Sequence, residues 1–183
     1  MIETLNDERL MEQLASGKKM AAGILYDRNY KKVFGYFVRM TKDSDVSRDL
    51  TQNVFLKILK YSQSWKPDKV FAYWLFRIAR NELVDYYRGT KKFFAVEEDR
   101  ELVIKDSTDS VKEMEIKESY DILIEAMGQL QPGDRELIEL NRFQGFSYKE
   151  IAGTISSNEN AVKVRTFRAI QKLKEIYSKI LIE

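Results

Sequence analysis

The chain has 183 residues, of which 44% are hydrophobic and 33% charged, a balance typical of a folded, helix-rich protein. It contains neither cysteine nor histidine, which excludes disulfides, thiolate nucleophiles, Cys/His zinc sites and imidazole bases. The net charge is only +2, but it is unevenly distributed. Basic residues outnumber acidic ones by seven in residues 1–95, whereas acidic residues outnumber basic ones by six in residues 96–121. This segregation favours two folded regions joined by an acidic connector.

Residues 1–95 show helical periodicity, with no strand-like alternation. A first short helix carries three leucines and ends at Gly17, a suitable C-terminal cap. Further helices are expected at residues 20–37, 46–61 and 71–88. Pro67 places the loop SQSWKPDK before the last of them. The apolar positions expected to face inward are Leu5, Leu10 and Leu14, then Met20, Ile24, Tyr30, Phe34 and Phe37, then Val46, Leu50, Val54, Leu56 and Leu59, and finally Phe71, Leu75, Ile78, Ala79 and Leu83.

Residues 96–121 form the acidic connector, which lacks a sustained apolar stripe before about Val111. Its composition is that of a solvated linker, although a charged surface loop would have the same composition. We take the connector as the boundary between domains at residues 1–95 and 122–183. The predicted fold class is all-α, with two small helical domains joined by an acidic flexible linker. The polar start differs from a signal peptide, and no apolar run approaches roughly 20 residues, so we expect a cytoplasmic protein without membrane insertion.

The C-terminal region is expected to contain four helices. The first runs from about Val111 to Leu130, and QPGD then turns the chain into a second helix at about residues 135–143. Ser147 followed by Glu150 matches a capping box, which predicts a third helix at residues 148–155. The fourth helix begins after Asn158, in the polar corner SSNEN, and continues towards the terminus. Ser156, Ser157 and Asn158 are all candidate caps for it.

Two helices joined at a tight polar corner, the second carrying cations, are typical of a helix-turn-helix. On the last helix one stripe is expected to pack on Leu140, Ile151, Ala152 and Ile155, namely Val162, Thr166, Ala169, Leu173 and Ile176. The opposite face carries Asn160, Lys163, Arg165, Arg168 and Lys172. Arg and Lys bind phosphates, and Arg also binds guanine edges. An ordinary helical hairpin with a solvated basic face has the same pattern, so this half alone leaves both interpretations open.

The helix at residues 71–88 carries cations among aromatic residues. Arg77, Arg80, Asn81 and Arg88 are expected on its outside, amid Tyr73, Trp74, Tyr86 and Tyr87. This mixture suits single-stranded nucleic acid, whose bases stack on rings while the backbone meets the cations. Most of these aromatic residues are equally explained as core. Trp65, in the polar loop, either covers the core or forms an exposed stacking platform, and the sequence leaves both interpretations open.

Four segments occur in this order along the chain: ILYDRNYKKVFGYF, DLTQNVFLKILK, FAYWLFRIARNELVDYYR and SYKEIAGTISSNENAVKVRTFRAIQKLKE. Together they resemble the extracytoplasmic-function (ECF) class of bacterial RNA polymerase sigma factors, in the sigma-70 family, over nearly all of residues 10–180. The resemblance implies a non-enzymatic initiation factor that directs core RNA polymerase to promoters and helps melt the minus-ten element. Its implied partners are the clamp of the largest polymerase subunit, the flap, promoter DNA and an anti-sigma factor. No cofactor, metal or small-molecule substrate is expected.

The resemblance also implies roles for particular residues. Those matching the polymerase-binding motif are Asp49, Leu50, Gln52, Asn53, Phe55 and Leu56. Those matching the minus-ten surface are Trp65, Lys69, Tyr73, Arg77, Arg80, Asn81 and Arg88. Those matching the minus-thirty-five surface are Asn160, Lys163, Val164, Arg165, Arg168 and Lys172. Three residues depart from the family pattern. Asn53 stands where the family usually has an acid, Val164 stands where it often has a small polar residue, and Thr166 stands where it often has a leucine.

Three other functions are open to such a chain. A stand-alone dimeric helix-turn-helix regulator would explain residues 146–174 but gives DLTQNVFLKILK no purpose. An enzyme is disfavoured, because SGKK is no phosphate loop: Glu12 occupies the required glycine position and Lys19 replaces the Ser or Thr. The acids at residues 97–99 lie on the connector and lack the preorganisation of a metal site. A helical adaptor without a nucleic-acid role would show no salt-dependent DNA binding.

Overall fold

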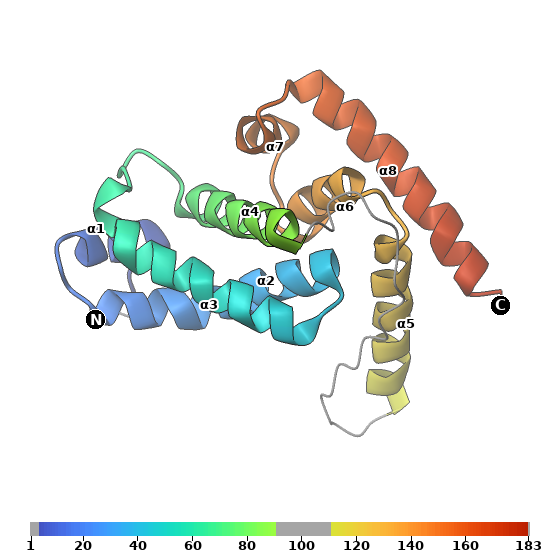
Figure 1. Cartoon of the computed structure of the whole chain (residues 1–183), viewed down its shortest axis with the longest axis horizontal. Helices are drawn as coiled ribbons and strands as arrows, with labels where there is room; N and C mark the ends of the chain where they lie inside the picture. Colours follow the sequence, from blue (N-terminus) through green and yellow to red (C-terminus); the bar gives the residue numbers. More distant parts are fainter. Residues whose placement is uncertain (1–3, 91–110, 183) are drawn as a thin grey trace. The chain divides into compact units, whose positions relative to one another are not determined.

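The structure is a computed structural model that describes residues 4–90 and 111–182, and these residues contain helices and no strand (Figure 1). By packing, the chain divides into two units. The first lies within residues 1–37 and 45–99, and the second within residues 38–44 and 100–183. The predicted all-α class with two helical domains is thus confirmed. Most of the predicted connector, residues 96–110, lies outside the described residues, as do the acids at 97–99.

The helices that lie wholly or mostly in the first unit are α1 (Asp7–Ala15), α2 (Met20–Thr41), α3 (Ser44–Tyr61) and α4 (Phe71–Thr90), with a 3-10 turn at Ser62–Ser64. Gly17 has φ +93° just beyond α1, in the left-handed region that favours glycine, as its predicted capping role requires. The core of this unit is formed by apolar side chains of all four helices, among them Leu10, Leu25, Val33, Tyr36, Leu50, Val54, Ile58, Phe71, Leu75 and Phe76.

The prediction that Leu56, Leu59 and Met20 face the core is wrong. Leu56 and Leu59 are 61% and 44% exposed, and Met20 is 77% exposed. The buried stripe of α3 follows Leu50, Val54 and Ile58, and a helix turns about 100° per residue. Leu56 therefore lies about 200° around the helix from Val54, on the side that faces solvent. Apolar residues on more than one side of α3 concealed this division of the helix into two faces.

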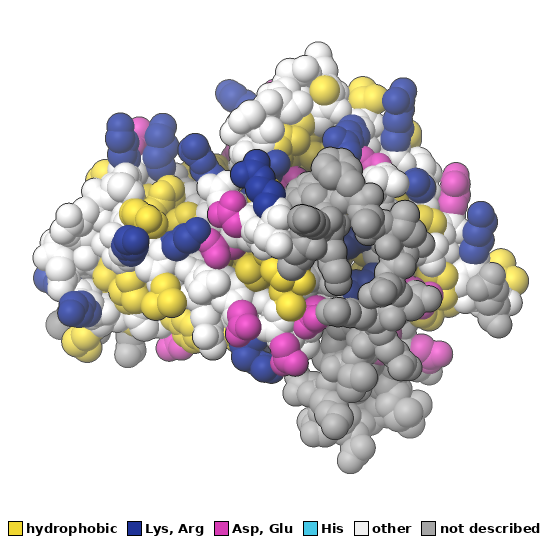
Figure 2. All heavy atoms as spheres, in the orientation of Figure 1, with side chains coloured by type: hydrophobic (Ala, Val, Ile, Leu, Met, Phe, Trp, Pro, Cys, Tyr) yellow, Lys and Arg dark blue, Asp and Glu magenta, His cyan; other side chains and the backbone are white. Residues whose placement is uncertain are grey.

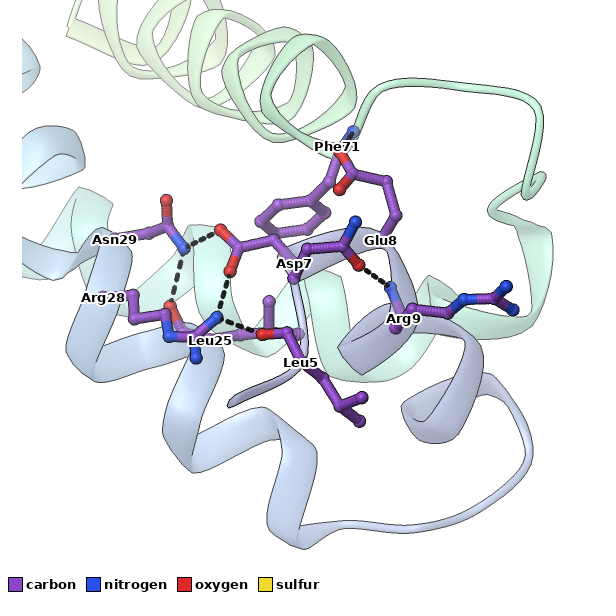
Figure 3. A network of polar contacts seen from close by, with 9 residues as sticks. Leu5, Asp7, Glu8, Arg9, Leu25, Arg28, Asn29 and Phe71 are labelled. Carbon is purple, nitrogen blue, oxygen red and sulfur yellow. Dashed lines mark hydrogen bonds and ion pairs between the residues drawn. The ribbon is translucent and has the colours of Figure 1, made fainter. Parts of the chain in front are cut away.

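A polar network joins α1 to α2 and α4 (Figure 3). The Asp7 carboxylate accepts hydrogen bonds from Arg28 Nη1 at 3.0 Å and from Asn29 Nδ2 at 2.9 Å. Glu8 Oε1 accepts from the backbone N–H of Phe71 at 3.1 Å. That N–H is one of the unpaired donors at the start of α4, so Glu8 acts as a cap supplied from another helix. The network fixes the start of α4, which carries the predicted minus-ten residues.

The second unit contains α5 (Val111–Gly128), α6 (Pro132–Ile138), a π-helical turn (Glu139–Phe143), α7 (Tyr148–Ile155) and α8 (Glu159–Ile180). The predicted capping box is present: the Ser147 side chain accepts from the Glu150 N–H, and the Glu150 side chain accepts from the Ser147 N–H at 2.7 Å. Of the three candidate caps for α8, Asn158 is the one used, since its side chain accepts from Ala161 N–H at 2.8 Å.

The residues 38–44 that belong to the second unit include Arg39, which forms a buried ion pair with Glu139. Arg39 Nη2 lies 2.7 Å from Glu139 Oε1, and Glu139 has no exposed surface. Burial raises the pKa of Glu139 above its usual range, and hydrogen bonds from Arg39 and Gln144 oppose that shift. The Arg39 guanidinium also lies 4.2 Å from the ring centroid of Phe143. Loss of either partner of the pair would leave a buried charge uncompensated.

Thr166 lies on the inner face of α8, fully buried, and its hydroxyl has no hydrogen-bond partner within the described residues. Valine has nearly the same shape without the hydroxyl. We therefore expect Thr166→Val to raise the free energy of unfolding of the second unit by about 1 kcal/mol. Urea denaturation followed by helical circular dichroism, with hydrogen exchange to locate the effect, measures this change.

Thr154→Val is the matched control for that experiment. The Thr154 hydroxyl donates to the Glu150 carbonyl at 2.9 Å, so its removal forfeits a hydrogen bond instead of relieving an unpaired group. The stabilising effect is therefore expected for Thr166→Val alone. Equal losses of stability in both variants would contradict the assignment of an unpaired hydroxyl at Thr166.

Candidate nucleic-acid interface

The second unit forms the predicted helix-turn-helix from α7 and α8. Ile151 and Ala152 of α7 are buried, as are Val162 and Ala169 of α8, and the two helices pack directly on each other. Ser156 ends α7 with φ +56°, a left-handed conformation that glycine adopts most easily. The turn is therefore made despite the absence of glycine. Its other residues are exposed, which agrees with the polar corner expected from the sequence.

The outer face of α8 carries every residue predicted for it. Six exposed side chains come from the first four turns of this one helix, namely Asn160, Lys163, Val164, Arg165, Arg168 and Lys172. Figure 2 shows several Lys and Arg side chains along the edge where Figure 1 draws α8. Within the part of the chain that the structure describes, Lys163, Arg168 and Lys172 have no ion-pair partner. Their charges are thus available to a polyanion.

Arg165 differs from the other cations of this face. Its Nε lies 2.6 Å from Asp134 Oδ1 in the first turn of α6. Its guanidinium also lies over Gly133, where an added Cβ would come within 2.5 Å of Nη2. Arg165 therefore ties α8 to α6 through an ion pair that exists without any ligand. Sequence reasoning missed this partner, because Asp134 is 31 residues away and nothing in the local pattern of α8 indicates it.

The predicted minus-ten residues lie on or before α4. Arg77, Asn81 and Arg88 are exposed, whereas Arg80 is half-buried. Tyr73 is half-buried as well, and the exposed Lys69 lies 3.3 Å from the carboxylate of its neighbour Asp68. Arg77, Asn81 and Arg88 are spaced by four and seven residues, so α4 presents them on one face. This face has the hydrogen-bonding groups and charges that a nucleic-acid strand requires.

Trp65 is only 5% exposed and belongs to the core of the first unit. The 3-10 turn Ser62–Ser64 packs against α1 and directs the chain so that Trp65 lies over that core. Of the two interpretations that the sequence left open, the structure therefore supports the cover over the core. A stacking platform for a base requires an exposed ring face, and this conformation of Trp65 does not offer one.

The residues of the predicted polymerase-binding motif divide between surface and core. Asp49, Gln52, Asn53 and Leu56 are exposed on one face of α3. Leu50 and Phe55 are instead buried, at 6% and 7% exposure, and the Phe55 ring packs edge-on against Tyr26 with centroids 4.8 Å apart. The exposed side also includes Leu59, at 44% exposure, which sequence reasoning did not assign to this surface. Exposed apolar residues among polar ones are typical of a protein-binding surface.

An ion pair joins the helix of this surface to the helix of the minus-ten surface. Lys57 of α3 contacts the Glu82 carboxylate of α4, and Glu82 is buried. The hydrogen bond to Glu82 raises the pKa of Lys57 above its usual range, so the lysine stays charged at neutral pH. The pair holds α3 and α4 in register within the first unit.

Comparison with known proteins identifies the family. Residues 25–93 match the family described as Sigma-70 region 2, and residues 120–173 match Sigma-70, region 4. The chain is 31% identical over 157 residues to the ECF RNA polymerase sigma factor SigM of Bacillus subtilis (strain 168), a match that covers 85% of this chain and 94% of that protein. The chain belongs to the sigma-70 family of RNA polymerase sigma factors, in the ECF class.

Other relatives agree with this family. The RNA polymerase sigma factor CarQ of Myxococcus xanthus is 27% identical over 175 residues, covering 94% of this chain and 98% of that one. The solved structure of CnrH in complex with the cytosolic domain of CnrY is 26% identical, with a TM-score of 0.70 and coverage of 94% and 97%. The sigma factor RpoE of Bartonella quintana, crystallised with the anti-sigma factor NepR, shares the fold at 20% identity and a TM-score of 0.66, with coverage of 84% and 96%.

This ECF sigma factor is therefore a transcription initiation factor by family. The match to region 2 contains α3 and α4, and the match to region 4 contains the helix-turn-helix as far as Leu173. None of the described helices combines the length and the hydropathy needed to cross a membrane. Over the same described residues, no cluster of Asp and Glu is placed to hold a metal ion.

The ion pair of Arg165 gives a prediction for DNA binding by this sigma factor. Because Asp134 already holds Arg165, we expect Arg165→Gln to leave the salt dependence of duplex binding nearly unchanged. If Lys163 and Arg168 each contact a phosphate, Lys163→Gln or Arg168→Gln is expected to reduce the slope of log K against log salt by about 1. Equilibrium binding of the polymerase holoenzyme to promoter DNA between low and moderate salt measures the slope.

Asp134→Asn is the companion variant of Arg165→Gln. Both remove the same ion pair, so both are expected to lower the stability of the second unit by similar amounts, about 1 kcal/mol or less because the pair is partly exposed. A reduction of the salt slope by about 1 in Arg165→Gln alone would show instead that Arg165 leaves Asp134 for a phosphate.

Proposed function

We propose that this sigma factor binds core RNA polymerase through α3, reads the minus-thirty-five element through α8 and holds the melted minus-ten element through α4. The observation that supports the proposal is that each of the three implied sets has exposed members on a different helix, although Leu50, Phe55 and Trp65 of those sets are buried. A stand-alone regulator needs only the helix-turn-helix. It gives no reason for the exposed face of α3, where Leu56 and Leu59 meet solvent beside Asp49, Gln52 and Asn53.

The α3 face is suited to a protein partner, and we assign it to the clamp of the largest polymerase subunit. Leu56 supplies apolar area, and the polar side chains around it supply hydrogen bonds at a rim. Asn53 replaces the acid usual in the family, so one charged contact with the clamp becomes a neutral one. The flap of the polymerase is a further partner implied by the family resemblance.

For the minus-ten element, the proposal is that α4 captures a single strand after the duplex opens. Arg77, Asn81 and Arg88 offer two cations and an amide on one exposed face. Unstacking a base costs a few kcal/mol, and contacts made only with the open strand offset that cost. Core polymerase supplies the remaining contacts, which accounts for a chain whose own net charge is only +2.

Regulation by an anti-sigma factor is part of the proposal. CnrH and the Bartonella RpoE were both solved with a bound partner, and the latter partner is an anti-sigma factor. The similar fold of this chain supports a partner of the same kind, acting in the cytoplasm where polymerase works. The protein itself is expected to catalyse no reaction.

Permanganate footprinting tests the role of α4 in strand capture. Core polymerase with the full-length chain is expected to make unpaired thymines in the minus-ten region of a cognate promoter reactive. Replacement of both Arg77 and Asn81 by alanine is expected to reduce that reactivity severalfold while the complex with core polymerase still forms. If the double variant opened the promoter as well as the unaltered chain, the assignment of α4 would be wrong.

A further inference from the structure

Two exposed apolar side chains lie among the cations of α8. Val164 is 50% exposed and Phe167 is 62% exposed. They stand three residues apart, so they are neighbours on the helix surface. Lys163 precedes Val164 and Arg168 follows Phe167, and both cations are exposed. A small apolar patch flanked by positive charge therefore forms part of the outer face of the helix-turn-helix.

This patch is no part of the core of the second unit. The buried stripe of α8 runs through Val162, Thr166 and Ala169, and Val164 lies about 200° around the helix from Val162. Nothing in the packing of the unit requires a valine or a phenylalanine to face solvent here. The two side chains are thus available to a ligand.

The charge around the patch identifies the kind of ligand. Lys163, Arg168 and Lys172 favour a polyanion, and the patch lies in the part of α8 that a helix-turn-helix presents to the major groove. The apolar group that bases present in that groove is the 5-methyl group of thymine, which aliphatic and aromatic side chains contact. An apolar protein partner would meet three uncompensated cations at the same surface.

We propose that Val164 and Phe167 contact thymine methyl groups in the upstream promoter element, so that this sigma factor selects a T·A pair there by its methyl group. The proposal rests on the proposed function of α8 and adds the base class that the helix selects. Val164 is the deciding residue, because its exposed side chain is aliphatic and lies beside the exposed Lys163. Serine at this position would offer a hydrogen bond to a base edge in place of an apolar contact.

The test uses holoenzyme made from core polymerase and the full-length chain. A promoter library first defines the upstream element, and each thymine in it, on either strand, is then replaced by deoxyuridine, which lacks only the methyl group. We expect one or two positions at which deoxyuridine weakens binding about three- to fivefold, as loss of one buried methyl predicts. In the Val164→Ser holoenzyme the same exchange is expected to have no effect at the position contacted by Val164.

Phe167→Ala and Leu181→Ala complete the design. Phe167→Ala is expected to reduce the deoxyuridine effect as well. Leu181 is 58% exposed beyond the end of α8, and Leu181→Ala is expected to leave the deoxyuridine effect unchanged. Promoter-specific binding without any deoxyuridine effect, or an effect that survives both Val164→Ser and Phe167→Ala, would overturn the inference and leave the proposed function standing. Absence of promoter-specific binding with core polymerase would overturn both.

Discussion

Replacement of Leu56 by aspartate is expected to lower the affinity of this sigma factor for core RNA polymerase by about 30-fold, the loss typical of a central interface residue. Leu56 is 61% exposed on α3, so the first unit keeps its core and its fold. In the complex, however, a carboxylate would be buried against the clamp without a partner. Competition for core polymerase against a labelled sigma factor measures the affinity.

Two comparisons make the Leu56 result specific. Val70→Asp places the same charge at another exposed apolar position of the first unit, 45% exposed just before α4, and is expected to bind core polymerase normally. Phe55→Ala is the less informative variant, because Phe55 is buried against Tyr26 and its loss destabilises the unit itself. Equal affinities of the Leu56→Asp and unaltered chains for core polymerase would remove α3 from the interface.

Trp65→Ala is expected to lower the free energy of unfolding of the first unit by about 3–5 kcal/mol, because it empties a large buried site. Trp65→Phe is expected to cost less than Trp65→Ala, because the phenyl ring refills most of the site. The indole Nε1 has no hydrogen-bond partner within the described residues, so phenylalanine forfeits no such bond. Urea denaturation followed by fluorescence of Trp74, the remaining tryptophan and a residue of the same unit, measures both changes.

The opposite pattern would contradict the assignment of Trp65 to the core. If Trp65→Ala kept the urea midpoint of the unaltered chain but abolished permanganate reactivity in the minus-ten region, the ring would act as a platform for a base. A change in both would mean that the unit unfolds, and the loss of permanganate reactivity would then follow from the lost core.

Features set by local chemistry were predicted well from the sequence. The capping box of Ser147 and Glu150, the cap at Gly17 and the basic face of α8 depend on residues within a few positions of each other. The helix-turn-helix followed from these local signals together with an apolar stripe at helical spacing. Resemblance to a family then supplied roles that periodicity alone leaves undecided, such as those of Asp49 and Gln52.

Features set by contacts between distant residues were not predictable in this way. Leu56 and Leu59 were assigned to the core because α3 is apolar on more than one side, and only tertiary packing decides which side is covered. Trp65 stands in a polar loop, and its burial depends on how the turn Ser62–Ser64 meets α1. Arg165 looked equivalent to its cationic neighbours until the fold brought Asp134 beside it.

Transcription from a promoter library by bacterial core RNA polymerase, with and without this chain, tests the central claim most directly. The account predicts new start sites that depend on the chain, with two shared upstream elements spaced for minus-ten and minus-thirty-five recognition, and their loss with Leu56→Asp. A chain that bound duplex DNA as a dimer in the absence of polymerase, and left the start sites of core polymerase unchanged, would contradict the account and support a stand-alone regulator.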